Sequence, residues 1–244
     1  MSAVAAIVKR ELRGYFVTPV AYVFIVVFLF LTGAFTFYPG GFYERNQADL
    51  EPFFRFHPWL YLFLMPAISM RLWAEERKSG TIELLLTLPV AVHEAVLGKF
   101  LAAWLFTALA LALTFPMWLT VNYLGDPDNL AILAGYAGSL VMAGGFLAIG
   151  ACISALTRNQ VIAFVVSVVA CFLFVMSGYP LVLDFFRGWA PAALVDAIAS
   201  FSFLTHFHSI KRGVIDARDL VFFGSLMAFW LYANVLAIQS RKAN

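Results

Sequence analysis

Charge is scarce in this sequence. Charged residues make up 12% of the 244 positions and hydrophobic residues 63%, with a mean hydropathy of +0.88. Soluble domains carry about 25% charged residues, so this composition excludes an ordinary soluble domain and favours a membrane protein that contacts the lipid bilayer. The net charge of +2 is too small to indicate a nucleic-acid partner.

Nucleotide-binding and catalytic motifs are also missing. The sequence has no G-x-x-x-x-G-K-[ST] motif, because Gly98-Lys99 is followed by Phe100 and lacks both the upstream glycine and the hydroxyl that holds magnesium. No Ser/His/Asp cluster, carboxylate pair or metal triad lies within one apolar run, so we expect neither an enzyme nor a cofactor. The runs also lack the buried acids and bases on which ion-driven transporters depend, which disfavours a secondary transporter.

Potential metal and redox ligands are few. The two cysteines, Cys152 and Cys171, lie in different apolar runs and at depths that differ by roughly 16 Å of helical rise, so we expect buried thiols and no disulfide. His206 and His208 offer ligands for copper or zinc, with His57 on the same predicted side. A histidine pair at i, i+2 without a neighbouring cysteine is more typical of ordinary surface histidines, so we expect no metal site.

Long uncharged runs predict the transmembrane helices. About 20 helical residues cross roughly 30 Å of hydrocarbon, and five runs are long enough. The second run reaches this length when it extends to Ala74, with Arg71 directed toward the headgroups. We therefore predict an all-α polytopic membrane protein with six transmembrane helices in one domain, residues 1–244. The runs cover residues 14–43, 56–70, 100–125, 129–157, 159–183 and 220–240.

Lysine and arginine predict the orientation. Six helices place both termini on one side together with residues 71–99, and that side holds ten of the 16 basic residues. The positive-inside rule then places both termini in the cytoplasm, as expected for a multi-pass protein of the bacterial inner membrane.

Two segments outside the runs predict helices at the membrane surface. Residues 2–13 combine apolar side chains with basic ones, which is typical of an interfacial helix, and Pro19 marks the turn into the first span. The apolar residues are Val4, Ile7, Val8 and Leu12, and the basic ones are Lys9, Arg10 and Arg13. Residues 182–219 mix aromatic and polar side chains, and we expect one or two short helices there, resting on the outer face between spans five and six.

The segment EERKSGTIELLLTLPVAVHEAVLGK, residues 75–99, is the only densely charged stretch between two long apolar runs. Ser79-Gly80 provides a break, Thr81 restarts a helix, and Pro89 ends it. We interpret this as a helix at the membrane surface that presents one face to a partner, with a solvated loop as the alternative. Gly80 fits a positive φ at the corner, although a simple loop glycine fits equally well.

Small residues mark a close-packed face on the fourth span. Gly144, Ala148 and Cys152 recur every four residues, which lets helix backbones approach closely in lipid. Packing inside one chain is favoured over a dimer interface.

Two blocks carry a resemblance to a known family. EERKSGTIELLLTLPV with Glu94 and the following GKF resembles the cytoplasmic coupling segment of ABC-2 type transporter permeases, in particular the gliding-motility-associated permease and its copper-processing relatives. KREL-x-x-YF-x-TPVAYV, residues 9–23, resembles the opening of the same family. The resemblance implies a coupling helix between spans two and three that docks into a cleft of the ATPase. It assigns this role to Glu75, Glu76, Arg77, Gly80, Thr81 and Glu83.

The resemblance implies a permease subunit that couples ATP hydrolysis by a separate cytoplasmic ABC ATPase to substrate export or to force transmission. A second permease chain, identical or different, would complete a dimer. Motility, copper-site assembly and export of lipid or polysaccharide remain open. The alternative is a membrane-embedded assembly factor or enzyme with an outer His/Asp site and no ATPase partner.

Overall fold

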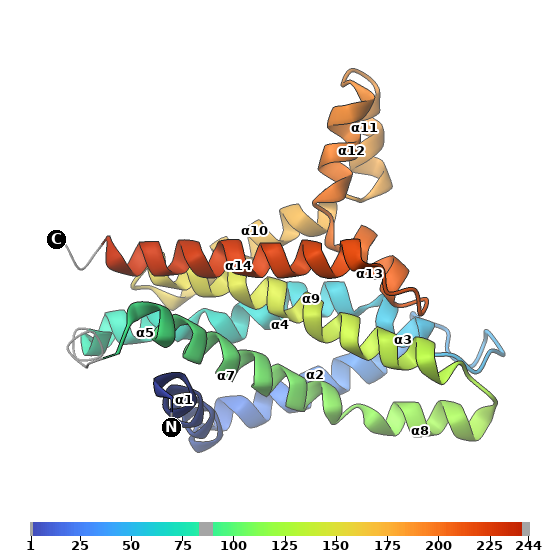
Figure 1. The fold of residues 1–244 in the computed structure, drawn as a ribbon. Coiled ribbons are helices and arrows are strands. Elements are labelled where there is room, and N and C mark those ends of the chain that lie inside the picture. The colour runs from blue at the N-terminus through green and yellow to red at the C-terminus, as the bar shows by residue number, and fades with distance from the viewer. Residues whose placement is uncertain (1, 83–89, 241–244) are drawn as a thin grey trace.

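A computed structural model describes residues 2–82 and 90–240, and every regular element within these ranges is a helix. Most of the helices run side by side in one elongated bundle (Figure 1). We call its two ends the α1 end, where α14 also finishes, and the α8 end. The helices are α1 (Ala3–Val17), α2 (Pro19–Phe37), α3 (Glu51–Arg55), α4 (His57–Ser69), α5 (Arg71–Ser79), α7 (Val92–Ala112), α8 (Phe115–Leu124), α9 (Asn129–Leu156), α10 (Gln160–Met176), α11 (Pro180–Arg187), α12 (Ala192–Ser200), α13 (Phe203–Ile210) and α14 (Ala217–Gln239).

The chain has four to six candidate membrane spans within the described ranges. Four helices are long and apolar enough to cross a membrane: α2, α7 continued by α8, α9 and α14. Two pairs, α10 with α11 and α12 with α13, qualify when each is counted as one span, although they bend by 68° and 66°. The prediction of an all-α polytopic membrane protein is confirmed.

The second and fifth predicted spans differ from expectation. Residues 56–70 form α4, whose 13 residues rise roughly 20 Å, too short to cross the hydrocarbon alone. Met70 keeps helical backbone angles and α5 follows directly, so the helical path continues past residue 70, although α4 with α5 is not among the candidate spans. The span predicted over residues 159–183 is not one continuous helix, because α10 ends at Met176 and Pro180 starts α11 in a new direction.

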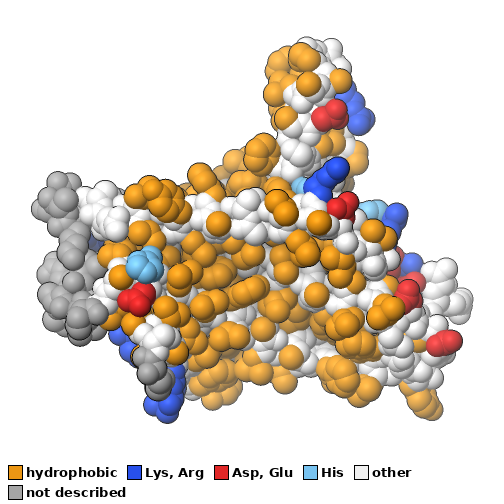
Figure 2. Space-filling view, in the orientation of Figure 1, with side chains coloured by type: hydrophobic (Ala, Val, Ile, Leu, Met, Phe, Trp, Pro, Cys, Tyr) orange, Lys and Arg blue, Asp and Glu red, His pale blue; other side chains and the backbone are white. Residues whose placement is uncertain are grey.

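α9 forms the centre of the bundle. It packs against α4, α5, α7, α10, α13 and α14, and 83% of its apolar stretch is buried, against 28% for α2 and α14. The outer helices instead expose large apolar side chains, and Figure 2 shows hydrophobic groups along the bundle with charges gathered near its ends and on the α11–α12 projection. So much exposed apolar surface is rare in soluble proteins and fits contact with lipid. Examples are Val26, Phe30, Val169 and Phe229.

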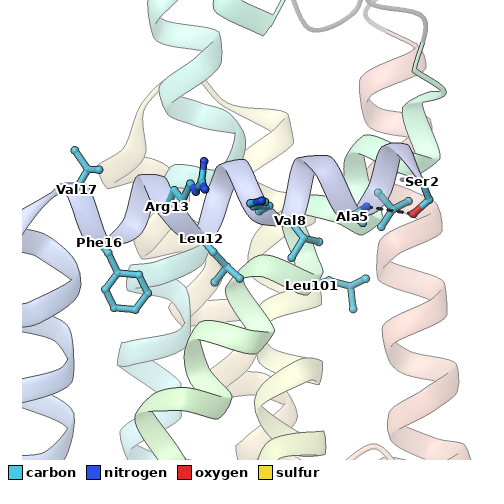
Figure 3. A pocket seen from close by; sticks show the side chains of 10 residues that line it. Ser2, Ala5, Val8, Leu12, Arg13, Phe16, Val17 and Leu101 are labelled. Atoms are coloured by element: carbon cyan, nitrogen blue, oxygen red, sulfur yellow. Dashed lines mark hydrogen bonds between the residues drawn. The ribbon is translucent and has the colours of Figure 1, made fainter.

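The helices outside the bundle axis only partly match the predictions. α1 crosses the end of the bundle that carries its name (Figure 3), and it extends to Val17, beyond the predicted helix over residues 2–13. Pro19 lies in the first turn of α2, so the predicted turn is confirmed. α11 and α12 contact each other and project away from the bundle (Figure 1), whereas the prediction had such helices resting on the outer face.

Candidate functional site

The charged segment predicted to contact a partner lies at the α1 end of the bundle. α5 ends at Ser79, and Gly80 adopts φ +75° with no atom beyond its neighbours along the chain within 4 Å of the position that a Cβ would take. This left-handed conformation favours glycine at the end of a helix, so the predicted positive φ is confirmed. Thr81 is helical again. Glu83 lies outside the described residues.

The side chains of this segment divide into two faces. The Glu75 side chain is 51% exposed, whereas that of Glu76 is 21% exposed and Arg77 is half-buried. Five exposed residues, one at position 75 and four at positions 78–81, form what we call the outward face. They are Glu75, Lys78, Ser79, Gly80 and Thr81. The residues assigned to docking by resemblance therefore do not share one surface, because Glu76 and Arg77 face the bundle.

Glu76 belongs to an ion-pair cluster around Lys99. The Lys99 side chain, on α7, is 3% exposed, and its Nζ lies 2.8 Å from Glu76 Oε1 and 3.2 Å from Glu11 Oε1. Arg10 Nη2 lies 2.6 Å from Glu11 and 3.7 Å from Glu76. The ammonium also lies 5.2 Å from the centroid of the Trp73 ring, in range of a cation–π contact. This Lys99 cluster (Lys99, Glu76, Glu11 and Arg10) joins α1, α5 and α7.

The charges in the Lys99 cluster depend on one another. Burial by itself raises the pKa of the Glu11 carboxyl, but Lys99 and Arg10 outweigh burial and leave this pKa below its usual value. Glu76 Oε2 is buried without a hydrogen-bond partner in the described part of the chain, so Glu76 is held mainly through Oε1. Loss of the lysine would leave two neighbouring carboxylates poorly compensated.

A hydroxyl on α9 holds the joint between α4 and α5. Ser154 Oγ donates to the carbonyl of Met70 at 2.8 Å and accepts from the N–H groups of residues 73–74, each at 3.1 Å. These N–H groups lie in the first turn of α5, where helical donors lack partners within the helix. Arg77 also donates to the carbonyl of Ala155. α5 is therefore anchored to the central helix as well as to the Lys99 cluster.

α1 packs closely on α7. A Cβ at Gly98 would lie 2.7 Å from Ile7 Cγ2, so only glycine allows this approach without a shift. The rings of Tyr15 and Phe106 stack with centroids 5.0 Å apart. Because α1 and α7 share this contact and the Lys99 cluster, a displacement of one helix must displace the other.

The outer histidines lie in different environments. His206 and His57 are buried and bonded within the chain, so the expectation of surface histidines is wrong for these two, whereas His208 is exposed. His206 Nδ1 lies 2.6 Å from Asp219 Oδ1, and its Nε2 lies 2.9 Å from the Ser200 carbonyl. His57 is completely buried at the start of α4, with Nδ1 2.7 Å from Ser139 Oγ. These histidines do not converge, and no group of three or more His, Cys, Asp or Glu side chains suited to a metal lies in residues 2–82 and 90–240.

The small-residue row of α9 lies inside the chain. A Cβ at Gly144 would lie 2.6 Å from Met227 Sδ and 3.2 Å from Trp104 Nε1, on α14 and α7. Ala148 and Cys152 are buried, and both cysteines of the chain are free. The arrangement is that of packing within one chain.

A family model described as an ABC-2 family transporter protein matches residues 59–231, which is more than half of the chain and includes α5, Lys99 and Ser154. The chain belongs to this family. It is therefore a multi-pass membrane permease component of an ABC transporter. A comparison with curated proteins finds no match.

ABC-2 permeases generally work with a cytoplasmic ATPase and often dimerise. The family match begins after α1 and α2, so the resemblance of residues 9–23 lies outside it. The narrower likeness to gliding-motility-associated and copper-processing permeases stays a prediction.

Proposed function

We propose that this ABC-2 permease is the transmembrane subunit of an exporter whose ATPase is a separate chain, and that the outward face of α5 binds this ATPase. The division of α5 into two faces carries the proposal. One face presents Glu75 and Lys78 to a partner and continues beyond the helix to Thr81, while the other is fixed to three helices of the bundle. A partner that moves α5 would therefore move the bundle, as an attachment through a flexible loop would not.

The proposed path of force has two branches from α5. One runs through Glu76 and Lys99 into α7, and from there through Glu11 into α1. The other runs through Ser154 and Arg77 into α9, against which most of the bundle packs. Packed helices shift as rigid bodies between alternative arrangements, so a push on α5 is expected to reorient the spans relative to one another.

The roles of the docking candidates follow from this division. We assign direct contact with the ATPase to Glu75, Gly80 and Thr81, joined by Lys78 and Ser79. Glu76 and Arg77 become connectors that transmit the movement. For Glu83, the resemblance alone supports a docking role.

In the proposed orientation the α1 end faces the cytoplasm of a bacterium, both termini lie on that side, and the inner membrane surrounds one transmembrane domain. The basic residues of α1 and α5, together with Lys99 and Arg158, support this orientation through the positive-inside rule. Two permease chains and two ATPase copies would complete the exporter, whose output is a transported substrate or force on an envelope partner.

The test compares two exposed acid–base pairs with the same spacing. In the variant Glu75→Ala with Lys78→Ala, we expect roughly tenfold weaker retention of the ATPase and lower ATPase stimulation, because contact charges typically contribute 1–2 kcal/mol to binding. The matched control is Asp184→Ala with Arg187→Ala, an exposed pair on α11. Membrane insertion should persist in both. Equal retention of the ATPase by both variants would contradict docking at the outward face.

A further inference from the structure

α1 borders an apolar groove of about 830 Å³ on the side of the helix away from the Lys99 cluster. Its walls include Val8, Leu12 and Phe16 of α1 and Leu101 of α7. Figure 3 shows these three α1 side chains on the side of α1 that faces along the bundle, with Leu101 of α7 near Val8. The volume lies in the range of roughly 300–1,000 Å³ that is typical of small-molecule sites.

The groove is continuous with the apolar exterior of the bundle. Leu97, Leu101 and Leu105 follow at intervals of four on α7 and so share one helical face, and the first and last are 39% and 49% exposed. Such exposed leucines face lipid in a membrane-spanning helix. An apolar chain that enters the groove from the bilayer can therefore lie along α7 without crossing polar surface.

Two cations on the rim of the groove lack acidic partners. Lys9 and Arg13 are one turn apart, exposed, and among the residues that line the groove. Within residues 2–82 and 90–240 neither lies within 4.0 Å of a carboxylate, whereas the neighbouring Arg10 pairs with Glu11 and Glu76. Figure 3 shows the Arg13 side chain directed away from Leu12 and Phe16, so its charge lies at the edge of the groove and not among the apolar walls. The rim therefore attracts an anion, while the interior accepts only apolar groups.

We propose that the groove binds one anionic phospholipid of the surrounding leaflet, with its phosphate at Lys9 and Arg13 and an acyl chain along Val8, Leu12 and Leu101. An amphiphile satisfies both halves of the site, and a membrane-surface helix with adjoining basic side chains is a typical place for an anionic headgroup. The lipid would steady α1, which carries Glu11 of the Lys99 cluster. The site does not depend on ATPase docking at α5.

Native mass spectrometry of the purified permease in detergent tests the proposal, with phosphatidylglycerol and phosphatidylcholine of identical chains as probes. We expect preferential retention of phosphatidylglycerol. Lys9→Gln with Arg13→Gln should weaken its binding roughly 30-fold, since each basic side chain near an anionic surface contributes about a 5-fold gain in affinity. The control Arg158→Gln with Arg212→Gln removes two exposed cations elsewhere and should leave binding unchanged.

A second variant tests the apolar half of the site. Ala5→Trp fills the groove from an exposed position and keeps both cations, so it should abolish phosphatidylglycerol retention. Glycerol phosphate, which has the headgroup charge and no chains, should compete poorly. Equal retention of the two lipids, full retention by either groove variant, or competition by glycerol phosphate as strong as that by the lipid would overturn the proposal.

Discussion

Replacement of Lys99 with methionine removes the charge on which the three-helix connection depends. The variant leaves the carboxylates of Glu76 and Glu11 facing each other with Arg10 as the remaining cation. Removal of one partner of a buried ion pair costs about 3–5 kcal/mol. Because the two carboxylates are 21% and 19% exposed and Arg10 remains, we expect the lower limit, about 3 kcal/mol of unfolding free energy.

The free energy of unfolding can be measured in mixed micelles by a detergent titration followed through tryptophan fluorescence. Lys99→Met with Glu76→Gln should cost less than the sum of the single variants, with a coupling energy of about 1–3 kcal/mol. The control Lys78→Met alters an exposed lysine on α5 and should stay within about 0.5 kcal/mol of the wild type. Additive costs, or a loss below about 1 kcal/mol for Lys99→Met, would refute the reasoning.

The same variant separates docking from transmission. Lys99 lies behind the outward face, so Lys99→Met should retain the ATPase in co-purification and lower the transport-coupled ATPase stimulation. Glu75→Ala with Lys78→Ala should instead lower both. If Lys99→Met lost the bound ATPase and kept full stimulation per bound ATPase, the assignment of Glu76 and Lys99 as connectors would be wrong.

Three further predictions concern the packing and the α8 end. Ser154→Ala should cost about 1–3 kcal/mol in the same titration, because two buried N–H groups of α5 lose their acceptor. Gly150→Ala should cost about 1–3 kcal/mol, since its Cβ would overlap a hydroxyl of α4, while Gly33→Ala, with open space around it, should not destabilise the bundle by overlap. Burial by itself raises the pKa of Glu51, but hydrogen bonds from Arg45 and a neighbouring lysine lower this pKa to about 2. A carboxyl with a lowered pKa stabilises the fold at pH values above its unfolded pKa of 4.5. The free energy of unfolding should therefore fall as the pH drops from about 4.5 to 2, and it should fall less in the variant Glu51→Gln.

Sequence reasoning predicted the features that are encoded locally. Long uncharged runs located α2, α9 and α14, because an apolar stretch of about 20 residues has few alternatives to a membrane helix. Pro19 and Gly80 marked backbone turns, since each restricts or extends the allowed φ angles by itself.

Features that depend on distant partners could not be predicted in this way. Four consecutive charges in residues 75–78 favoured a solvated face. Glu76 is nevertheless directed into the bundle, because its carboxylate pairs with Lys99. Lys99 also pairs with Glu11, from which it is 88 positions distant in the sequence. Lys99 contributed to the predictions through its charge and through the Gly98-Lys99 and GKF patterns, but its burial between Glu76 and Glu11 depends on contacts that the local sequence does not indicate. The joint at Met70 likewise depends on Ser154, 84 positions away.

Site-specific photo-crosslinking tests the central claim most directly. Benzoylphenylalanine is placed at Lys78 or Ser79 on the outward face, and at Asp184 on α11 as a control, in cells that express the intact transporter. We predict that the two outward-face positions crosslink to a polypeptide with a nucleotide-binding P-loop, identified by mass spectrometry, and that position 184 does not. Crosslinks to such an ATPase from position 184 alone, or from none of the three positions, would contradict the claim that an ATPase binds the permease at the outward face.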